Sequence, residues 1–373
     1  MGLQPRALPD FPWDSLVPFR ERAQEHPDGV VDLSVGTPVD ATPELIQDAL
    51  RAAADAPGYP TTLGTADLRA AVGEWYARTR GVPGVGLDGV LPTVGSKELV
   101  AWLPALLGLG AGDAVVFPAS AYPTYAVGAT LTGATPVAAD DPDAWADRTD
   151  VKLVWINSPS NPTGEVLSKE QLRRIVRQAR AVGAVVASDE CYAALPWSEP
   201  WVTDGIPSVL DPEVCDGSHE GLLSVYSLSK QSNLAGYRAA FVAGDPALIK
   251  ALVEVRKHAG MIVPAPVQAA MTVALRDDAH VAAQREIYRA RREALLPAVQ
   301  GAGFQVSGSE AGLYLWATRG EDCWDTIAAL ADQGIVAAPG VFYGEAGAQH
   351  VRIALTASDE RIAQAVNRLY KLK

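Results

Sequence analysis

The sequence predicts an α/β protein with a large domain, in which helices cover a mainly parallel mixed sheet, and a smaller α+β domain. Up to about residue 275, apolar runs that fit buried strands alternate with helical periodicities, which is typical of parallel-rich sheets. From Asp277 onward, a long charged helix is followed by short strand candidates. At 373 residues the chain is also longer than one typical hydrophobic core supports.

The proline-rich N-terminus is expected to be an arm, over residues 1–30, that packs with the small domain. We place the large domain at residues 31–275 and the small domain at residues 276–373. The large domain begins with an apolar run, Val30–Val35, that ends in Gly36-Thr37-Pro38.

Two helices are expected next. Thr42 would cap the first, with Pro43 at its first helical position. Its apolar face would carry Leu45, Ala49 and Ala52. Thr65 would cap the second. The apolar face of that helix would carry Leu68, Val72 and Trp75.

A strand that leads directly into a helix is predicted at residues 90–106. The apolar run Val90–Val94 is followed at once by Gly95-Ser96-Lys97 and then by a helical periodicity. The apolar face of this helix would carry Leu99, Trp102, Leu103 and Leu106. Free backbone N–H groups at such a helix start point at any anion bound there.

Polar motifs also follow two later strands. Val151–Asn157 leads into Asn161-Pro-Thr-Gly164, and Ala184–Ala187 leads into Asp189-Glu-Cys-Tyr192. Ligands of open α/β sheets bind at the carboxyl ends of the strands. We therefore expect these motifs to meet in one crevice.

The stretch Ser224–Phe241 is predicted to form a strand, a loop and a second strand, with Lys230 in the loop. Four hydroxyl groups surround this lysine in sequence, on Tyr226, Ser227, Ser229 and Ser232. A lysine in this setting suits a covalent anchor for an aldehyde cofactor that also carries a phosphate. An ordinary solvated surface lysine is the alternative.

The small domain is expected to follow a helix that starts near Asp277. Its short strand candidates lie at 304–307, 312–317, 335–337 and 348–354, and the last of them carries Arg352. Ser358 would cap the final helix.

Composition excludes several classes of function. A net charge of −13 argues against nucleic-acid and anionic-membrane partners. Three cysteines without a CxxC pair, and five histidines without ligand spacing, give little support to a metal site or a disulfide framework. The most apolar stretch, Leu99–Gly112, is shorter than a membrane span. A cytoplasmic protein is expected.

The polar residues at the strand ends match the needs of pyridoxal phosphate. Its aldehyde needs a lysine, its ring nitrogen needs a buried carboxylate, and its phosphate needs a cradle of donors. The candidates are Lys230 for the aldehyde, Asp189 for the ring nitrogen, Asn161 and Tyr192 for the phenolic oxygen, Tyr122 for the ring face, and Ser96, Lys97, Ser227 and Arg238 for the phosphate.

Four motifs, in this order, resemble class I/II aminotransferases of pyridoxal-phosphate fold type I. They are Asn161-Pro-Thr-Gly164, Asp189-Glu-Cys-Tyr192, Ser227-Leu-Ser-Lys230 and Gly236-Tyr-Arg238. The resemblance covers nearly the whole chain. Within the family it is closest to the actinobacterial N-succinyldiaminopimelate aminotransferases, on the stretches Leu8–Asp14, Val31–Asp40, Lys97–Pro104 and Gly340–Gly344.

The resemblance implies a role for each candidate. Lys230 would form the Schiff base and then move the proton between the substrate α-carbon and the cofactor. Asp189 would pair with the pyridinium, Asn161 and Tyr192 would bond the phenolic oxygen, and Tyr122 would stack on the ring. The phosphate would be held by Ser96, by the backbone N–H of Lys97, by Ser227 and by Arg238.

The resemblance also implies how substrates and subunits meet. Arg352 would bind the α-carboxylate of the amino acid or 2-oxo acid, with the Gly36 N–H and Asn161 beside it. Tyr59 would reach the phosphate of the neighbouring subunit, so a homodimer with shared active sites is expected.

Some of these residues have ordinary structural alternatives. Asp189 could cap a helix, Arg352 could pair with a structural carboxylate, and Tyr122 could belong to the core. Cys191 is expected in the core, because alternation along an extended segment turns it away from the face of Asp189.

The implied reaction transfers an amino group between glutamate and N-succinyl-L-2-amino-6-oxopimelate, giving N-succinyl-LL-2,6-diaminopimelate. An aminotransferase for aspartate, alanine or aromatic amino acids, or a β-lyase of the same fold, is the first alternative. A non-enzymatic regulator that binds the cofactor is a remote one, because the arm is short and the chain is acidic.

Overall fold

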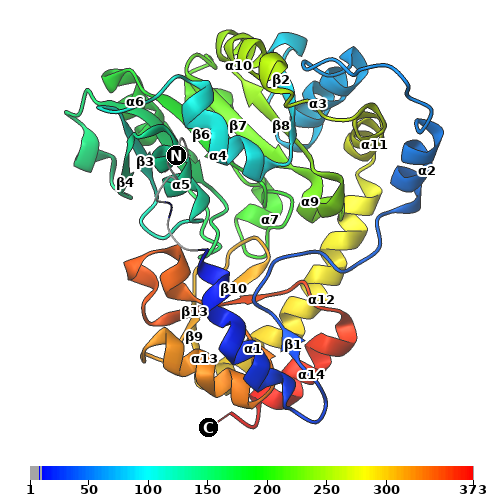
Figure 1. The fold of residues 1–373 in the computed structure, drawn as a ribbon, viewed down its shortest axis with the longest axis vertical. Helices are drawn as coiled ribbons and strands as arrows, with labels where there is room; N and C mark the ends of the chain where they lie inside the picture. The colour runs from blue at the N-terminus through cyan, green and yellow to red at the C-terminus, as the bar shows by residue number, and fades with distance from the viewer. Residues whose placement is uncertain (1–7, 9–10, 373) are drawn as a thin grey trace, which may run out of the picture.

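A seven-stranded mixed sheet forms the centre of the larger part of the computed structural model, which describes residue 8 and residues 11–372 (Figure 1). Its strands are β2 (Val90–Val94), β3 (Ala114–Phe117), β4 (Thr135–Ala138), β5 (Val151–Asn157), β6 (Val185–Asp189), β7 (Leu222–Ser227) and β8 (Ala239–Gly244). They are ordered β2-β8-β7-β6-β5-β3-β4, and β8 alone runs antiparallel to its neighbours. The predicted mainly parallel mixed sheet is confirmed.

Helices cover both faces of this sheet. The helices of this part of the chain are α2 (Glu44–Ala52), α3 (Ala66–Thr79), α4 (Ser96–Leu106), α5 (Thr124–Thr132), α6 (Lys169–Val182), α7 (Trp201–Asp204), α8 (Pro212–Cys215), α9 (Leu228–Gln231), α10 (Pro246–Ala259) and α11 (Ala265–Arg276). Val154 and Ile156 of β5 pack into the same core as α3, α6 and α11. The alternate residues Leu153 and Trp155 pack with α4, α5 and α10 on the other face. Because both faces are covered, function is confined to the ends of the strands.

A separate apolar core lies under a second, four-stranded antiparallel sheet. Its strands, in spatial order, are β12 (Ala338–Pro339), β13 (His350–Ala354), β10 (Tyr314–Thr318) and β9 (Gln305–Ser307). Helices α13 (Cys323–Asp332) and α14 (Asp359–Leu369) belong to this part, and α12 (Ala279–Gly301) runs into it from the large sheet (Figure 1). The division between residues 275 and 276 stays a prediction.

Residues 11–32, the described continuous part of the predicted arm and the strand after it, lie beside the second core, whereas residues 1–7 and 9–10 of that arm are outside the described part of the chain (Figure 1). Helix α1 (Val17–Gln24) follows a 3-10 turn at Pro12–Leu16, and its Phe19 stacks on Trp324 of α13 with 5.5 Å between ring centres. Strand β1 (Val31–Asp32) then pairs in parallel with β11 (Ile335–Val336). The other 3-10 turns are Leu87–Gly89, Pro142–Trp145, Ala235–Tyr237, Gly340–Tyr343 and Glu345–Gly347.

Several local predictions hold and three are wrong. Thr65 and Ser358 cap their helices as predicted. Thr42 does not cap α2, because Pro43 has extended backbone and is itself the residue before the helix. The buried stripe of α2 is centred on Ile46, and two residues of its predicted face, Leu45 and Ala52, are exposed. Trp102 is exposed as well, although it was predicted on the buried face of α4.

The third correction concerns Lys230. It lies in a helical turn, α9, rather than in a loop, because the Ser227 hydroxyl accepts a hydrogen bond from the Ser229 N–H and starts the turn. In the described part of the chain, no helix is long and apolar enough to cross a membrane.

Candidate active site

A cavity of about 490 Å³ opens at the carboxyl ends of β5, β6 and β7. Its lining includes the predicted residues Gly36, Ser96, Lys97, Tyr122, Asn161, Asp189, Tyr192, Ser227, Lys230, Arg238 and Arg352. Only Tyr59 of the predicted set is absent from this lining, and its side chain is fully exposed. The fold therefore brings together one set of side chains from both sheets and from the start of α4.

Asp189, the last residue of β6, carries a buried carboxylate without a cationic partner among the described residues. The Tyr125 hydroxyl donates to its Oδ2 at 3.0 Å, and the Cys191 N–H donates to its Oδ1 at 3.2 Å. Burial raises the pKa of this carboxyl group, and the two hydrogen bonds oppose the rise. Because a turn rather than a helix follows Asp189, this residue is not a helix cap.

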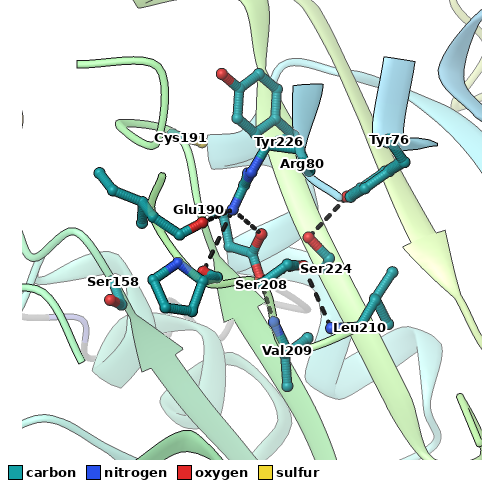
Figure 2. A network of polar contacts seen from close by, with 12 residues as sticks. Tyr76, Arg80, Ser158, Glu190, Cys191, Ser208, Val209, Leu210, Ser224 and Tyr226 are labelled. Atoms are coloured by element: carbon teal, nitrogen blue, oxygen red, sulfur yellow. Dashed lines mark hydrogen bonds and ion pairs between the residues drawn. The ribbon is translucent and has the colours of Figure 1, made fainter. Parts of the chain in front are cut away.

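The next residue, Glu190, does not line the cavity and belongs to a separate polar network (Figure 2). Its carboxylate pairs with Arg80 at 3.0 Å and accepts hydrogen bonds from the Ser208 hydroxyl and the Val209 N–H. Both members of the pair are almost completely buried. This network anchors the residue that follows β6, while the neighbouring Asp189 lines the cavity.

Lys230 lies in the cavity with its amine buried. Its Nζ donates a hydrogen bond to the carbonyl oxygen of Gly36. Burial is the main cause that lowers the pKa of this amine, and the cations of Arg352 and Arg238 lower it further. The neutral amine, which is the nucleophilic form and the one that accepts a proton, is thus present at lower pH than on an exposed lysine.

Three side chains of the cavity lining, those of Ser96, Ser227 and Arg238, are the ones predicted to hold a phosphate, and we call their part of the cavity its anion end. Ser96 is the first residue of α4, so the free N–H groups of that helix start face this end. The Ser227 hydroxyl is 2.8 Å from the Ser229 hydroxyl. The Arg238 guanidinium approaches Gly95 so closely that a Cβ at Gly95 would lie 2.0 Å from Nη2. Glycine at position 95, with φ of +77°, is therefore what admits the arginine.

The side chain of Lys97 takes another direction. Its Nζ lies 5.6 Å from the ring centre of Phe11 and 5.7 Å from that of Tyr122. The ammonium group is thus directed toward the aromatic side chains of the cavity and not toward the start of α4, where the backbone N–H groups lie.

Arg352, on β13, is buried without a carboxylate partner among residues 8 and 11–372. Nη1 donates to Asn161 Oδ1 at 2.8 Å, and Nη2 donates to the Ser34 carbonyl at 2.7 Å. The guanidinium carbon lies 3.9 Å from the ring centre of Tyr314. A structural ion pair therefore does not account for this arginine, and an anionic ligand would supply the missing counter-charge.

The structure adds three cavity residues whose contacts the sequence did not reveal. Asn157 accepts a hydrogen bond from the Asn161 N–H at 2.8 Å and so shapes that turn. Tyr125 supports Asp189, and Tyr314 bonds Tyr192. The first two are adjacent to predicted motifs, which was the available signal, whereas Tyr314 comes from the distant second sheet.

Cys191 departs from its prediction. It contributes to the apolar core but also lines the cavity, because the turn that follows β6 ends the strand alternation. Burial, followed by the charge of Asp189, raises the pKa of its thiol far above the ordinary value, so the thiolate nucleophile is suppressed.

A family model described as aminotransferase class I and II matches residues 28–369. The chain belongs to the class I and II aminotransferase family. It is 58% identical, over 98% of its length and 99% of the relative's, to a 4-dedimethylamino-4-oxo-anhydrotetracycline transaminase of Streptomyces rimosus. It is 31% identical, over 99% of its length and 98% of the relative's, to an LL-diaminopimelate aminotransferase of Aquifex aeolicus.

Solved structures agree with this assignment. A single mutant of the Thermus thermophilus aspartate aminotransferase superposes with a TM-score of 0.88 at 25% identity, over 100% of both chains. The predicted pyridoxal-phosphate fold type I is confirmed, and this chain is a pyridoxal 5′-phosphate-dependent aminotransferase. The chain is therefore an enzyme, and the alternative of a regulator without activity does not hold.

The cavity residues fit this cofactor. A buried carboxylate without a cation suits a protonated ring nitrogen, and Arg238, which pairs with no carboxylate among the described residues, suits a phosphate. The buried amine of Lys230, with its lowered pKa, suits an aldehyde.

Proposed function

We propose that this aminotransferase exchanges an amino group between L-glutamate and N-succinyl-L-2-amino-6-oxopimelate, giving 2-oxoglutarate and N-succinyl-LL-2,6-diaminopimelate. The observation that carries the proposal is an excess of basic side chains in the cavity. Five basic residues line it, namely Arg20, Lys97, Lys230, Arg238 and Arg352, against the single carboxylate of Asp189. A substrate with several carboxylates matches this balance.

Three of the five basic residues have roles at the cofactor or at the α-carboxylate, which leaves the cations of Arg20 and Lys97. Arg20, on α1, uses Nη2 to reach Asp32 at 3.2 Å and the Ser34 hydroxyl at 3.1 Å, and its side chain remains about one-third exposed. Lys97 pairs with no carboxylate among the described residues. We assign these two side chains to the succinyl tail, whose carboxylate would otherwise enter the cavity unpaired.

The proposed chemistry divides among the side chains as follows. When bound, the cofactor supplies the electron sink that makes the substrate α-proton acidic. Arg352 holds the substrate carboxylate with a planar pair of donors and so fixes which α-carbon bond faces Lys230. Lys230 would accept that proton on its neutral amine and serve as its carrier. Asp189 would hold the ring nitrogen as its counter-charge.

Cofactor placement is also part of the proposal. Ser96, the Lys97 N–H, Ser227 and Arg238 would hold the phosphate, and Tyr122 would cover the ring. Asn161 and Tyr192 would bond the phenolic oxygen. We further propose a cytoplasmic homodimer, in which Tyr59 of each subunit completes the phosphate site of the other.

A fused-ring ketone is the second candidate acceptor. The Streptomyces rimosus relative is named for a tetracycline precursor, and the aromatic side chains of Phe11, Trp13 and Tyr122 line the same cavity. Flat aromatic surfaces would stack on a polycyclic substrate. Aminotransferases for aspartate, alanine or aromatic amino acids, and β-lyases, remain alternatives of lower rank.

Half-reactions separate these acceptors. Glutamate should convert the purified holoenzyme to its amine form, with loss of the aldehyde-derived absorbance. The amine form is then mixed with each candidate, namely the succinylated oxopimelate, the same ketone without its succinyl group, pyruvate, oxaloacetate, and a fused-ring ketone. We expect kcat/KM to be about 100-fold higher for the succinylated ketone than for the ketone without it. Equal rates for these two, or a preference for the fused-ring ketone, would contradict the proposal.

A matched pair of arginine variants tests the assigned tail site. Arg20→Gln should lower kcat/KM for the succinylated ketone by about tenfold and leave the pyruvate reaction nearly unchanged. Arg22→Gln is the control, because Arg22 lies on the same helix but pairs with Asp332 on the surface. Equal effects of Arg20→Gln on both acceptors would contradict the assignment of Arg20 to the succinyl tail.

A further inference from the structure

Tyr314 lies at the junction of the two ends of the active site. It is a buried residue of β10, and its hydroxyl is 3.1 Å from the hydroxyl of Tyr192. Its ring centre is 3.9 Å from the guanidinium carbon of Arg352. One side chain thus contacts a residue assigned to the cofactor and a residue assigned to the substrate carboxylate.

Strand register and packing hold Tyr314 in this position. Arg352 of β13 lies opposite Trp316, so Tyr314, two residues earlier on β10, is its diagonal neighbour on the same face of the sheet. On the other side, Gly36 leaves room for the phenol, because a Cβ there would lie 2.1 Å from the Tyr314 hydroxyl. The hydroxyl therefore has little freedom to turn elsewhere.

The charged and titratable groups that interact with Tyr314 are Arg352, Lys230, Tyr192 and Cys191, with weaker contributions involving Tyr343 and Tyr288. Burial alone would raise the pKa of Tyr314, but the cations of Arg352 and Lys230 outweigh it and lower this pKa below the ordinary value. Burial, together with the charge of Tyr314, raises the pKa of Tyr192 instead. When both phenols are protonated, Tyr314 is the stronger acid and hence the better hydrogen-bond donor.

We propose that Tyr314 is a positioning residue that couples the two ends of the site. Its hydroxyl donates to Tyr192 Oη, which leaves the hydrogen of Tyr192 directed at the phenolic oxygen of the cofactor. Its ring holds the plane of Arg352 toward the substrate carboxylate. The inference rests on the roles proposed above for Tyr192 and Arg352, and it is independent of which ketone is the natural acceptor.

A chain of two hydrogen bonds strengthens each of its members. Loss of the Tyr314 hydroxyl should weaken the donation from Tyr192 and make the phenolic oxygen, and the imine conjugated with it, more basic. The ring contact with Arg352 should survive in phenylalanine but not in leucine. The two functions of Tyr314 can therefore be separated with two variants.

The experiment compares Tyr314→Phe, Tyr314→Leu and Tyr76→Phe in the holoenzyme. Absorbance titration without substrate gives the pKa of the bound cofactor, which we expect to rise by about half a unit in both Tyr314 variants. The KM for glutamate should stay within about twofold in Tyr314→Phe and rise about tenfold in Tyr314→Leu. Tyr76, a buried tyrosine outside the cavity whose hydroxyl bonds Ser224, should give no shift in the cofactor pKa when its hydroxyl is removed.

Two results would overturn the inference: an unchanged cofactor pKa in Tyr314→Phe, or an equal KM in the phenylalanine and leucine variants. A merely structural role would lower the melting temperature of both Tyr314 variants without moving the pKa. A holoenzyme without any aldehyde-derived absorbance would instead contradict the cofactor roles on which the inference rests.

Discussion

The carboxylate of Asp189 is buried and ionisable, and it accepts hydrogen bonds from the Tyr125 hydroxyl and from the N–H and thiol of Cys191. These neutral donors compensate a buried charge only in part. A protonated ring nitrogen would complete the compensation. Asp189 is therefore expected to favour the bound cofactor while it destabilises the protein without cofactor.

The sign of the pH effect follows from the raised pKa of Asp189 in the folded chain. The folded protein without cofactor binds this proton more tightly than the unfolded chain does. The stability gained from protonation is thus fully present below the ordinary pKa of 3.8 and is lost as pH rises through the raised value. At neutral pH the ionised group costs stability.

Asp189→Asn should therefore stabilise the cofactor-free protein at pH 7 by about 1 kcal/mol. The gain should shrink as the pH is lowered through the raised pKa of wild-type Asp189, because that carboxyl group then becomes protonated as well. The same variant should bind the cofactor at least about tenfold more weakly, since the ring nitrogen loses its counter-charge. Melting temperatures of the cofactor-free proteins across this pH range, with cofactor titrations, give both quantities. A variant that is less stable than wild type at pH 7 would contradict this account.

Cavity residues could be predicted where a polar side chain directly follows an apolar strand, as Asp189 and Lys230 do. Tyr314 and Asn157 could not, because their partners are set by strand register and by a turn rather than by sequence spacing. Position 314 is an ordinary aromatic residue of a short strand until β10 and β13 are aligned. Cys191 could not be placed for a different reason. The direction of its side chain depends on where β6 ends, and the sequence does not mark that end.

Elements are joined behind the active site by the buried pair of Arg80 and Glu190 (Figure 2). Arg80 is the residue that ends α3, and it also donates to the carbonyl oxygens of Ile206 and Pro207. Glu190 follows β6 directly. The pair thus links a helix, the strand that presents Asp189, and the loop after α7.

Arg80→Met should lower the free energy of unfolding by roughly 3–5 kcal/mol, because it leaves the Glu190 carboxylate buried and unpaired. Arg78→Met is the matched control, two residues away on α3. Arg78 pairs with Asp278 at the surface, with both side chains more than one-third exposed, and its loss should cost no more than about 1 kcal/mol. Urea denaturation of the two variants measures the difference, and equal midpoints would contradict it.

Helices and strands with clear end signals could be predicted. Which face of a helix is buried was harder to predict. The cap at Thr65 and the buried face of α3 follow from local sequence. The face of α2 does not, because the adjacent apolar residues Leu45 and Ile46 lie about 100° apart on the helix, and tertiary packing buries Ile46 rather than Leu45. Trp102 and Leu45 are apolar side chains that no contact within this chain buries.

At the scale of the whole molecule, the proposed phosphate site is incomplete without a second subunit. Tyr59 is fully exposed and contributes nothing to the cavity of its own chain. Exposed apolar side chains also occur nearby in sequence, at Val35, Val39 and Leu45. A second copy of the chain that covers this segment would bury them and bring its own Tyr59 to the cavity, as the proposed homodimer requires.

Mixed dimers test this arrangement directly. A dimer of one Lys230→Ala subunit and one Tyr59→Ala subunit contains one site with both Lys230 and Tyr59 if the tyrosine acts across the interface. If the tyrosine acts within its own subunit, neither site has both residues. Random re-association of the two variants in equal amounts should then restore about one quarter of wild-type activity at limiting cofactor, because half of the dimers carry one complete site. Each variant re-associated with itself is the control, and activity no higher than the mean of these two controls would exclude the shared site.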